Sequence, residues 1–130
     1  MNGNSQQNPL ALIIEDDEKL ANIFSFAMQS AEFETETIAD GKTAVTRLQH
    51  TLPAVVVLDL HLPFVSGNKI LRQIRADERL ADTRVMITTA DAMLAENLRD
   101  VADLVLLKPI SFKQLRDLAV RLRPSVPVLV

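Results

Sequence analysis

A regular alternation between short, continuous apolar runs and segments of helical period limits this sequence to few folds. Runs such as residues 54–58 are apolar throughout, which is typical of strands covered on both faces of a parallel sheet. The segments between the runs repeat their apolar residues every three or four positions, as helices with one buried face do. This alternation predicts an α/β fold in which helices cover both faces of a parallel sheet.

Five segments are expected to be strands: Leu10–Ile14, 33–39, 54–58, Arg84–Thr89 and Leu104–Leu107. In the second of these, Glu34 and Glu36 alternate with apolar and threonine residues. A charged face of this kind indicates an edge strand that leaves one side to water.

Five helices are expected to follow these strands. The second is predicted to begin at Asp40, the third after Gly67, and the fifth after Ser111, whose spacing to Gln114 fits a capping box. The fourth, at residues 92–100, has the weakest pattern and allows little more than two turns. The other four helices have expected buried faces formed, in chain order, by Leu20, Ile23, Phe24, Ala27, Met28 and Ala31; Ala44, Val45 and Leu48; Ile70, Leu71 and Ile74; and Phe112, Leu115, Leu118, Ala119 and Leu122.

The length of the chain, 130 residues, is that of a single domain with one hydrophobic core. We assign the domain to residues 10–123. The polar residues 1–9 are expected to be a disordered arm, and 124–130 a tail or the start of a linker. Cysteine is absent, which excludes disulfides and thiolate metal sites.

Composition also limits where such a domain works and what it contacts. No apolar run approaches the roughly 20 residues of a membrane span, and residues 1–9 lack the apolar segment of a signal peptide. A cytoplasmic location without membrane contact is therefore expected. The net charge of −3 argues against the broad basic surface that direct binding of nucleic acid requires.

Polar residues follow the expected buried strands directly, where ligands bind in open parallel sheets. The first strand runs into Glu15, Asp16 and Asp17 and the third into Asp59; the fourth ends in Thr88 and Thr89, and the fifth runs into Lys108 and Pro109. Because the carboxyl ends of parallel strands lie at one edge of the sheet, we expect these groups to lie close together.

Carboxylates packed together repel one another unless a cation joins them. Since no histidine or cysteine cluster is available, an oxygen-ligated Mg²⁺ is the expected cation. A carboxylate in such a site can attack phosphorus and carry an acyl phosphate. Mg²⁺ and Lys108 would then neutralise the charge on the phosphoryl oxygens.

Each of these residues also has a plain structural explanation. Asp17 is equally well explained as a helix cap, Asp59 as a turn former, Thr89 as a strand-end hydroxyl that binds local backbone, and Lys108 as an exposed loop residue. Their joint placement at four strand ends favours the functional interpretation.

These motifs resemble those of response-regulator receiver domains. The resemblance rests on residues 14–17 (Ile-Glu-Asp-Asp), 58–63 (Leu-Asp-Leu-His-Leu-Pro) with Gly67 after them, 87–90 (Ile-Thr-Thr-Ala) and 107–109 (Leu-Lys-Pro), and it runs from about Leu10 to Leu122. It implies a doubly wound, flavodoxin-like three-layer sandwich with strand order 2-1-3-4-5. It also implies that a histidine kinase or a phosphotransfer protein phosphorylates the aspartate of the third strand.

The resemblance assigns a role to each matching residue. Asp59 would be the phosphoacceptor and, with Asp16, would bind Mg²⁺ directly; Glu15 would act beside them, mainly through water, and His61 would offer its backbone carbonyl to the metal. Thr89 would donate a hydrogen bond to the phosphoryl group, and the small Ala90 would leave access to it. Lys108 would pair with the phosphoryl oxygens, and the peptide bond before Pro109 would be cis.

Two departures from the family pattern concern output. Val105 stands three residues before Lys108, where the family usually has a Tyr or Phe that acts as a rotameric switch. The stretch from Thr89 to Lys108 is also about three residues shorter than is common, and the difference falls on the helix at 92–100. The side chains of His61 and Asp91 are expected to flank the path of the water that hydrolyses an acyl phosphate. Asp91 could either orient that water or cap this helix.

Three functions are compatible with the residues: a phosphoacceptor switch that is not a classical enzyme, a degenerate receiver that acts as an interaction module, and a phosphatase of the haloacid-dehalogenase type. That phosphatase class places a second aspartate two residues after its nucleophile, where this chain has His61. We favour the switch, with an unknown downstream protein as partner and a homodimer as a further candidate. The sequence leaves open whether the domain stands alone or belongs to a longer protein.

Overall fold

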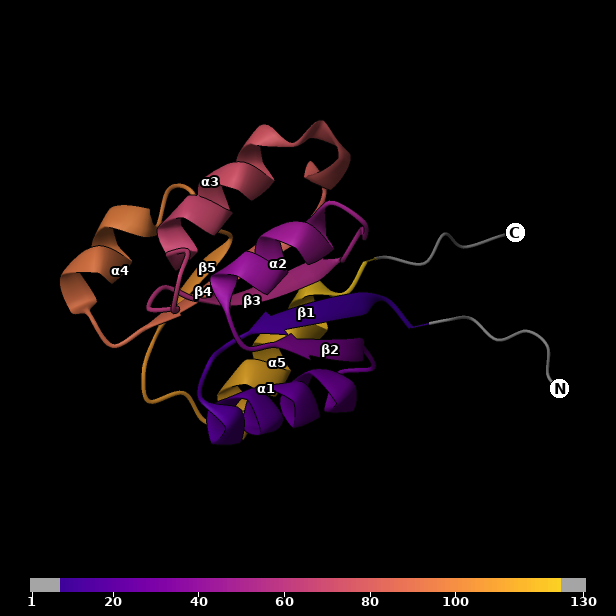
Figure 1. Ribbon diagram of the computed structural model, residues 1–130. Helices are drawn as coiled ribbons and strands as arrows, with labels where there is room; N and C mark the ends of the chain where they lie inside the picture. The colour runs from indigo at the N-terminus through magenta and orange to yellow at the C-terminus, as the bar shows by residue number, and fades with distance from the viewer. Residues whose placement is uncertain (1–7, 125–130) are drawn as a thin grey trace, which may run out of the picture.

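The computed structural model describes residues 8–124, which form a five-stranded sheet with the order β2-β1-β3-β4-β5 (Figure 1). All four pairs of neighbouring strands are parallel. The strands are β1 (Leu10–Ile14), β2 (Glu34–Ile38), β3 (Val55–Asp59), β4 (Arg84–Thr89) and β5 (Leu104–Leu107). The predicted topology is therefore confirmed, with β2 at an edge as its charged face indicated.

Helices cover both faces of this sheet. On one face lie α1 (Glu18–Ser30) and α5 (Phe112–Leu122); on the other lie α2 (Gly41–Leu48), α3 (Gly67–Ala76) and α4 (Ala92–Leu98) (Figure 1). The short 3-10 helix η1 (Glu78–Leu80), which the sequence pattern did not predict, connects α3 to β4. None of the helices within residues 8–124 combines the length and the apolar character that crossing a membrane requires.

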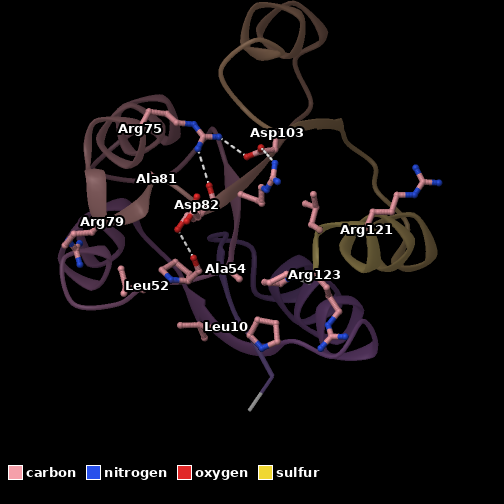
Figure 2. Close-up of a pocket in the computed structure, with 16 residues that line it drawn as sticks. Leu10, Leu52, Ala54, Arg75, Arg79, Ala81, Asp82, Asp103, Arg121 and Arg123 are labelled. Atoms are coloured by element: carbon pink, nitrogen blue, oxygen red, sulfur yellow. Dashed lines mark hydrogen bonds and ion pairs between the residues drawn. The ribbon is translucent and has the colours of Figure 1, made fainter. Parts of the chain in front are cut away.

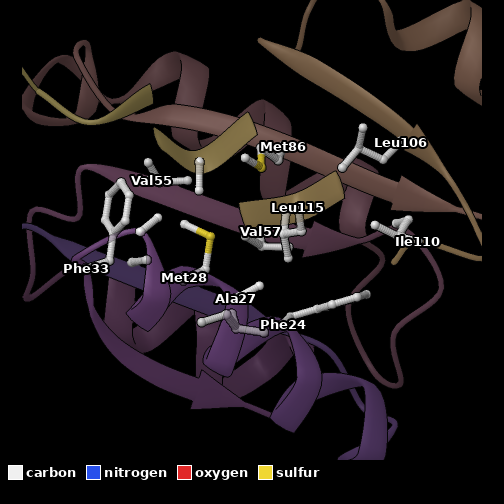
Figure 3. Close-up of a cluster of buried hydrophobic side chains, with 14 of the residues drawn as sticks. Phe24, Ala27, Met28, Phe33, Val55, Val57, Met86, Leu106, Ile110 and Leu115 are labelled. Carbon is white, nitrogen blue, oxygen red and sulfur yellow. The ribbon is translucent and has the colours of Figure 1, made fainter. Parts of the chain in front are cut away.

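The hydrophobic core is divided in two by the sheet, because successive strand residues point to opposite faces. In β1, Ala11 and Ile13 pack on the side of α1 and α5, whereas Leu12 and Ile14 pack on the side of α2 and α3. Figure 3 shows the first of these cores, where side chains of α1 and α5 lie over β3 and β4. Burial on both faces explains why β1 is apolar at every position.

Two predicted core residues are exposed instead. Ile23 on α1 is 42% exposed, and the unpredicted Ala21 is buried in its place. Ile23 lies about 100° around the helix from Phe24, so a face centred on Phe24 turns it toward solvent. Phe112 on α5 is 37% exposed, because it lies in the first turn of the helix, one turn before the first buried position.

The helix starts follow the local capping signals. Asp17, Asp40, Ser66 and Ser111 each accept a hydrogen bond from a backbone N–H in the first turn of the helix that follows, which satisfies donors that the helix itself leaves unpaired. The fourth helix ends at Leu98 rather than at residue 100. There the N–H groups of residues 101 and 102 both turn back to the Leu98 carbonyl, and the chain enters β5.

The predicted arm and tail fall largely outside the described residues, which exclude 1–7 and 125–130. At the start of the described chain, the Pro9 carbonyl accepts a hydrogen bond of 2.9 Å from the Glu34 N–H. Pro9 therefore extends the pairing of β1 with β2.

Candidate functional site

Three carboxylates meet at the carboxyl ends of β1 and β3. One oxygen from each of Glu15, Asp16 and Asp59 lies within 4.8 Å of the other two. The strands are neighbours in register, with Ile14 opposite Leu58, so the residues that follow them emerge side by side. Glu15 and Asp59 are buried, and Asp16 is exposed at the mouth of the cluster.

The ammonium group of Lys108 is the only positively charged group that contacts this cluster in the described part of the chain. Its Nζ lies 3.0 Å from Glu15 Oε1 and 3.6 Å from Asp59 Oδ2. Its backbone N–H donates to the Thr89 carbonyl at 2.7 Å, and the bond between Lys108 and Pro109 is cis, as expected. The ion pair with Glu15 joins residues 93 positions apart, and no local sequence signal predicts it.

The electrostatics of the cluster reflect a surplus of negative charge. Burial and, to a lesser extent, the negative charge of Asp59 raise the pKa of Glu15 to about 7. The hydrogen bonds from Lys108 and from the Asp17 N–H lower this pKa but do not outweigh burial. Burial alone would lower the pKa of Lys108, but the hydrogen bond to Glu15 and the charge of Asp59 outweigh it and raise that pKa. A cation added beside Asp16 would relieve the repulsion between the carboxylates.

The donor atoms of the cluster fit a hard cation. Glu15, Asp16 and Asp59 offer carboxylate oxygens, which suit Mg²⁺ and Ca²⁺ better than softer metals that prefer histidine or cysteine. Mg²⁺ keeps several of its waters and needs only one or two carboxylates from the protein. The cluster at the strand ends therefore has the donors for a hydrated magnesium ion.

Thr89 lies at the end of β4 with its side chain fully buried. Its hydroxyl oxygen accepts a hydrogen bond of 3.0 Å from the Asp91 N–H and lies 3.4 Å from His61 Nε2. We expected the His61 backbone carbonyl to join the metal ligands and its side chain to flank the path of a hydrolysing water. The contact between its ring and Thr89 was not predicted. Ala90, next in the chain, is exposed and leaves the approach to Thr89 open.

Two of the acidic residues near the site act as helix caps. Asp17 accepts a hydrogen bond from the Leu20 N–H at the start of α1. Asp91 accepts hydrogen bonds from two N–H groups at the start of α4, 3.0 and 3.1 Å away. The capping explanation is therefore confirmed for both. Val105 is half-buried on β5 among the residues of the α2–α3 side.

A glycine holds α3 against the backbone of Asp59. A Cβ built on Gly67 would lie 2.3 Å from the Asp59 carbonyl oxygen and 2.6 Å from Leu60 Cα, closer than any side chain can approach. The Gly67 N–H donates to the Leu60 carbonyl at 3.1 Å, and the His61 N–H donates to Asp59 Oδ1 at 3.1 Å. The sequence showed this glycine only as a helix start; its position eight residues after Asp59 was the available signal.

A hollow of about 1030 Å³ lies at the opposite ends of the strands from the carboxylate cluster. Figure 2 shows it between the start of β1 and the loops that lead into β3 and β4, with arginines around its rim. Arg75 is bound to Asp103 at 2.8 Å, and Arg79, Arg121 and Arg123 point in different directions. Arginines that diverge do not form a cradle for an anion, so the carboxylate cluster stays the candidate site.

Comparison with known proteins agrees with the geometry. A family model described as a response regulator receiver domain matches residues 11–120. The DNA-binding response regulator MtrA of Mycobacterium tuberculosis (strain ATCC 25618 / H37Rv) is 31% identical over 104 residues, which are 80% of this chain and 46% of that protein. The phosphate regulon transcriptional regulatory protein PhoB of Rhizobium meliloti (strain 1021) is 32% identical over 110 residues, with coverages of 82% and 48%. The chain thus spans about half the length of the curated relatives it matches.

Solved structures show the same fold. The receiver domain of the Francisella response regulator 1452 superposes with a TM-score of 0.77 at 27% identity, over 88% of this chain and 96% of that one. The chemotaxis response regulator CheY4 of Vibrio cholerae gives a TM-score of 0.80 at 23% identity, over 88% and 98%.

Proposed function

Because this chain belongs to the family of response regulator receiver domains, we propose that Asp59 is its phosphoacceptor. In this proposal a histidine kinase or a phosphotransfer protein donates the phosphoryl group in a Mg²⁺-dependent reaction. The modified domain then changes its interactions with a downstream protein.

The observation that carries the proposal is the convergence of three carboxylates and one ammonium at the strand ends. Glu15, Asp16 and Asp59 come within 4.8 Å of one another, and Lys108 reaches both buried carboxylates. A stable structural cluster would balance its charges more closely. An incomplete balance suits a site that receives a divalent cation together with a phosphoryl group.

Each residue has a chemical task in this reaction. An oxygen of Asp59 forms a bond to phosphorus while the bond from phosphorus to the donor nitrogen breaks, and the leaving imidazole keeps the electron pair. Asp16 and Asp59, with Glu15 beside them, would hold a Mg²⁺ ion, which would supply positive charge against the phosphoryl oxygens. Lys108 turns from Glu15 toward those oxygens and stabilises their charge from the other side.

Thr89 recognises the product. Its hydroxyl, now beside His61 and the Asp91 N–H, would turn toward the phosphoryl group on Asp59 and donate a hydrogen bond to it. The exposed Ala90 leaves room for this movement. The His61 carbonyl would complete the metal ligands.

The alternative is a receiver that acts as a phosphorylation-independent interaction module. The intact acidic cluster, threonine and lysine favour the phosphoacceptor, because a module that only docks has no need for buried carboxylates that repel each other. The DNA binding for which MtrA is named belongs to a protein about twice as long as the matched region. We carry over only the receiver role.

The test is direct labelling. Incubation with acetyl phosphate and Mg²⁺ should give a phosphoryl adduct in the intact mass, and Asp59→Asn should abolish it. Asp82→Asn, at an exposed aspartate on the rim of the opposite hollow, is the matched control and should label like the wild type. Labelling that persists in Asp59→Asn, or its absence from the wild type, would refute the assignment.

A further inference from the structure

A second hollow, of about 510 Å³, lies between α3 and α4 beside the candidate site. Its volume is in the range of cavities that bind ligands or partner side chains, roughly 300–1,000 Å³. Leu60 and His61, which directly follow Asp59, line it. The other residues that line it are Ser66, Asn68, Arg72, Leu94, Asn97 and Leu98.

The lining residues form two rows that run along the two helices. Asn68 and Arg72 are one turn apart on α3, and Leu94 and Leu98 are one turn apart on α4. Side chains at such spacing lie one above the other on the same helix face. Two such rows bound a channel parallel to the helices, which is the shape that accepts the side-chain ridge of a third helix.

The chemistry of the channel is apolar on one wall and cationic on the other. Leu94, on the α4 wall, is 37% exposed. Arg72 is exposed, and its side chain makes no ion pair or hydrogen bond with any residue in the range 8–124. Its neighbour Arg75, one turn on, is held by Asp103 and two backbone carbonyls. Arg72 is thus an available guanidinium, which prefers a carboxylate partner.

We propose that this channel binds an amphipathic helix of a partner protein. Apolar residues of that helix, three and four positions apart, would pack on Leu94 and Leu98, and a carboxylate at the edge of the same face would pair with Arg72. This is recognition of a helix in a groove.

Phosphorylation would reach this channel through His61, a step that rests on the proposed function. The His61 ring lines the channel and lies 3.4 Å from the Thr89 hydroxyl. When Thr89 turns toward a phosphoryl group on Asp59, the ring loses this contact and can change its position in the channel. The affinity of the helix would then differ between the two states, as any coupling between sites requires.

The experiment uses a synthetic helical peptide of about 15 residues, the length at which isolated helices become stable. It carries leucines three and four positions apart and one glutamate at the edge of that face. In a titration followed by amide chemical shifts, saturable changes should be confined to α3, α4 and the loop after Asp59. Arg72→Glu should weaken binding roughly fivefold or more, and a peptide with lysine in place of the glutamate should restore it.

Matched variants distinguish binding in the channel from non-specific binding of the peptide to the protein surface. Leu94→Glu should abolish binding, whereas Val120→Glu and Arg121→Glu, at exposed positions of α5 on the other face, should not change it. Urea unfolding of each variant checks that it folds. Absence of saturable binding, changes spread over α1 and α5, or failure of the lysine peptide to restore affinity to Arg72→Glu would overturn the proposal. A saturable response to acetate ions alone at Arg72 would assign the site to a small anion instead.

The link to phosphorylation is tested with beryllofluoride and Mg²⁺, which mimic the phosphoryl group. The peptide affinity should change at least severalfold, and His61→Ala should remove that change. If beryllofluoride shifts the amides around Asp59 but leaves the affinity unchanged, the coupling through His61 is wrong. If it produces no shifts around Asp59, the proposed function fails, and peptide binding still decides the channel by itself.

Discussion

Gly67→Ala is the substitution whose effect can be worked out most closely from the structure. The added Cβ would lie 2.3 Å from the Asp59 carbonyl oxygen and 2.6 Å from Leu60 Cα, where non-bonded atoms normally stay about 3.5–4.0 Å apart. The start of α3 must therefore move away from β3 by about 1 Å. Overpacking of this kind costs about 1–3 kcal/mol. Helix propensity returns up to about 1 kcal/mol of this.

The expected result is a net loss of about 1–2 kcal/mol in the free energy of unfolding, measured by urea denaturation. A larger effect is expected on labelling, because the backbone that moves carries Asp59, the proposed acceptor. Displacement of a reacting group by about 1 Å can cost about a hundredfold in rate. The rate of labelling by acetyl phosphate, measured by intact mass at conditions where the variant is fully folded, should fall by one to two orders of magnitude.

Gly41→Ala serves as the matched control. A Cβ at that position would lie 2.2 Å from the Val65 carbonyl oxygen, so the loss of stability should be similar. This clash falls on the loop before α3 and not on Asp59, so labelling should slow much less. A Gly67→Ala protein with the stability and labelling rate of the wild type would refute the reasoning, and so would equal slowing in both variants.

Three further predictions concern the carboxylate cluster, the ion pairs of Asp103 and the lifetime of the phosphorylated protein. Millimolar Mg²⁺ should raise the melting temperature, by the equivalent of about 2.7 kcal/mol at a hundredfold excess over Kd, and Asp16→Ala should abolish this rise. Without metal, Asp59→Asn should itself raise the melting temperature because it removes repulsion between carboxylates. A lower melting temperature in Asp59→Asn would contradict this. Asp103 pairs with two arginines. Burial alone would raise the pKa of Asp103, but its hydrogen bonds outweigh burial and lower that pKa below 3.8. The stability that the Asp103 carboxylate confers is therefore present above pH 3.8 and is lost as the pH falls through the folded-state pKa. Asp103→Asn should therefore cost about 1–3 kcal/mol at neutral pH, and urea unfolding should show this difference shrinking below about pH 4. His61→Ala should change the lifetime of the phosphorylated protein, whereas Asp91→Ala should chiefly remove a cap worth about 1 kcal/mol; a lifetime altered as much by Asp91→Ala would return that carboxylate to the hydrolysis step.

The five α-helices and five strands, their order along the chain and the edge at which the candidate site residues gather could be predicted from the sequence, whereas the 3-10 helix η1 was not. The spacing of apolar residues and the helix caps are set by residues within a few positions of one another. Asp17 and Ser111 could therefore be predicted to start helices without a structure. Parallel pairing then forces the residues after β1 and β3 to the same edge. For this reason Glu15, Asp16 and Asp59 could be predicted together from their places in the chain.

Which side chains touch, and which face of a helix is covered, depends on the tertiary structure. The exposure of Ile23 depends on how α1 is rotated against the sheet, and that rotation follows from the packing of all its neighbours together. The pairing of Lys108 with Glu15 and the contact of the His61 ring with Thr89 join residues distant in sequence. The approach of Gly67 to Asp59 depends on how closely α3 packs against β3. Such contacts depend on displacements of about 1 Å between packed elements, and nothing in the local sequence encodes distances that fine.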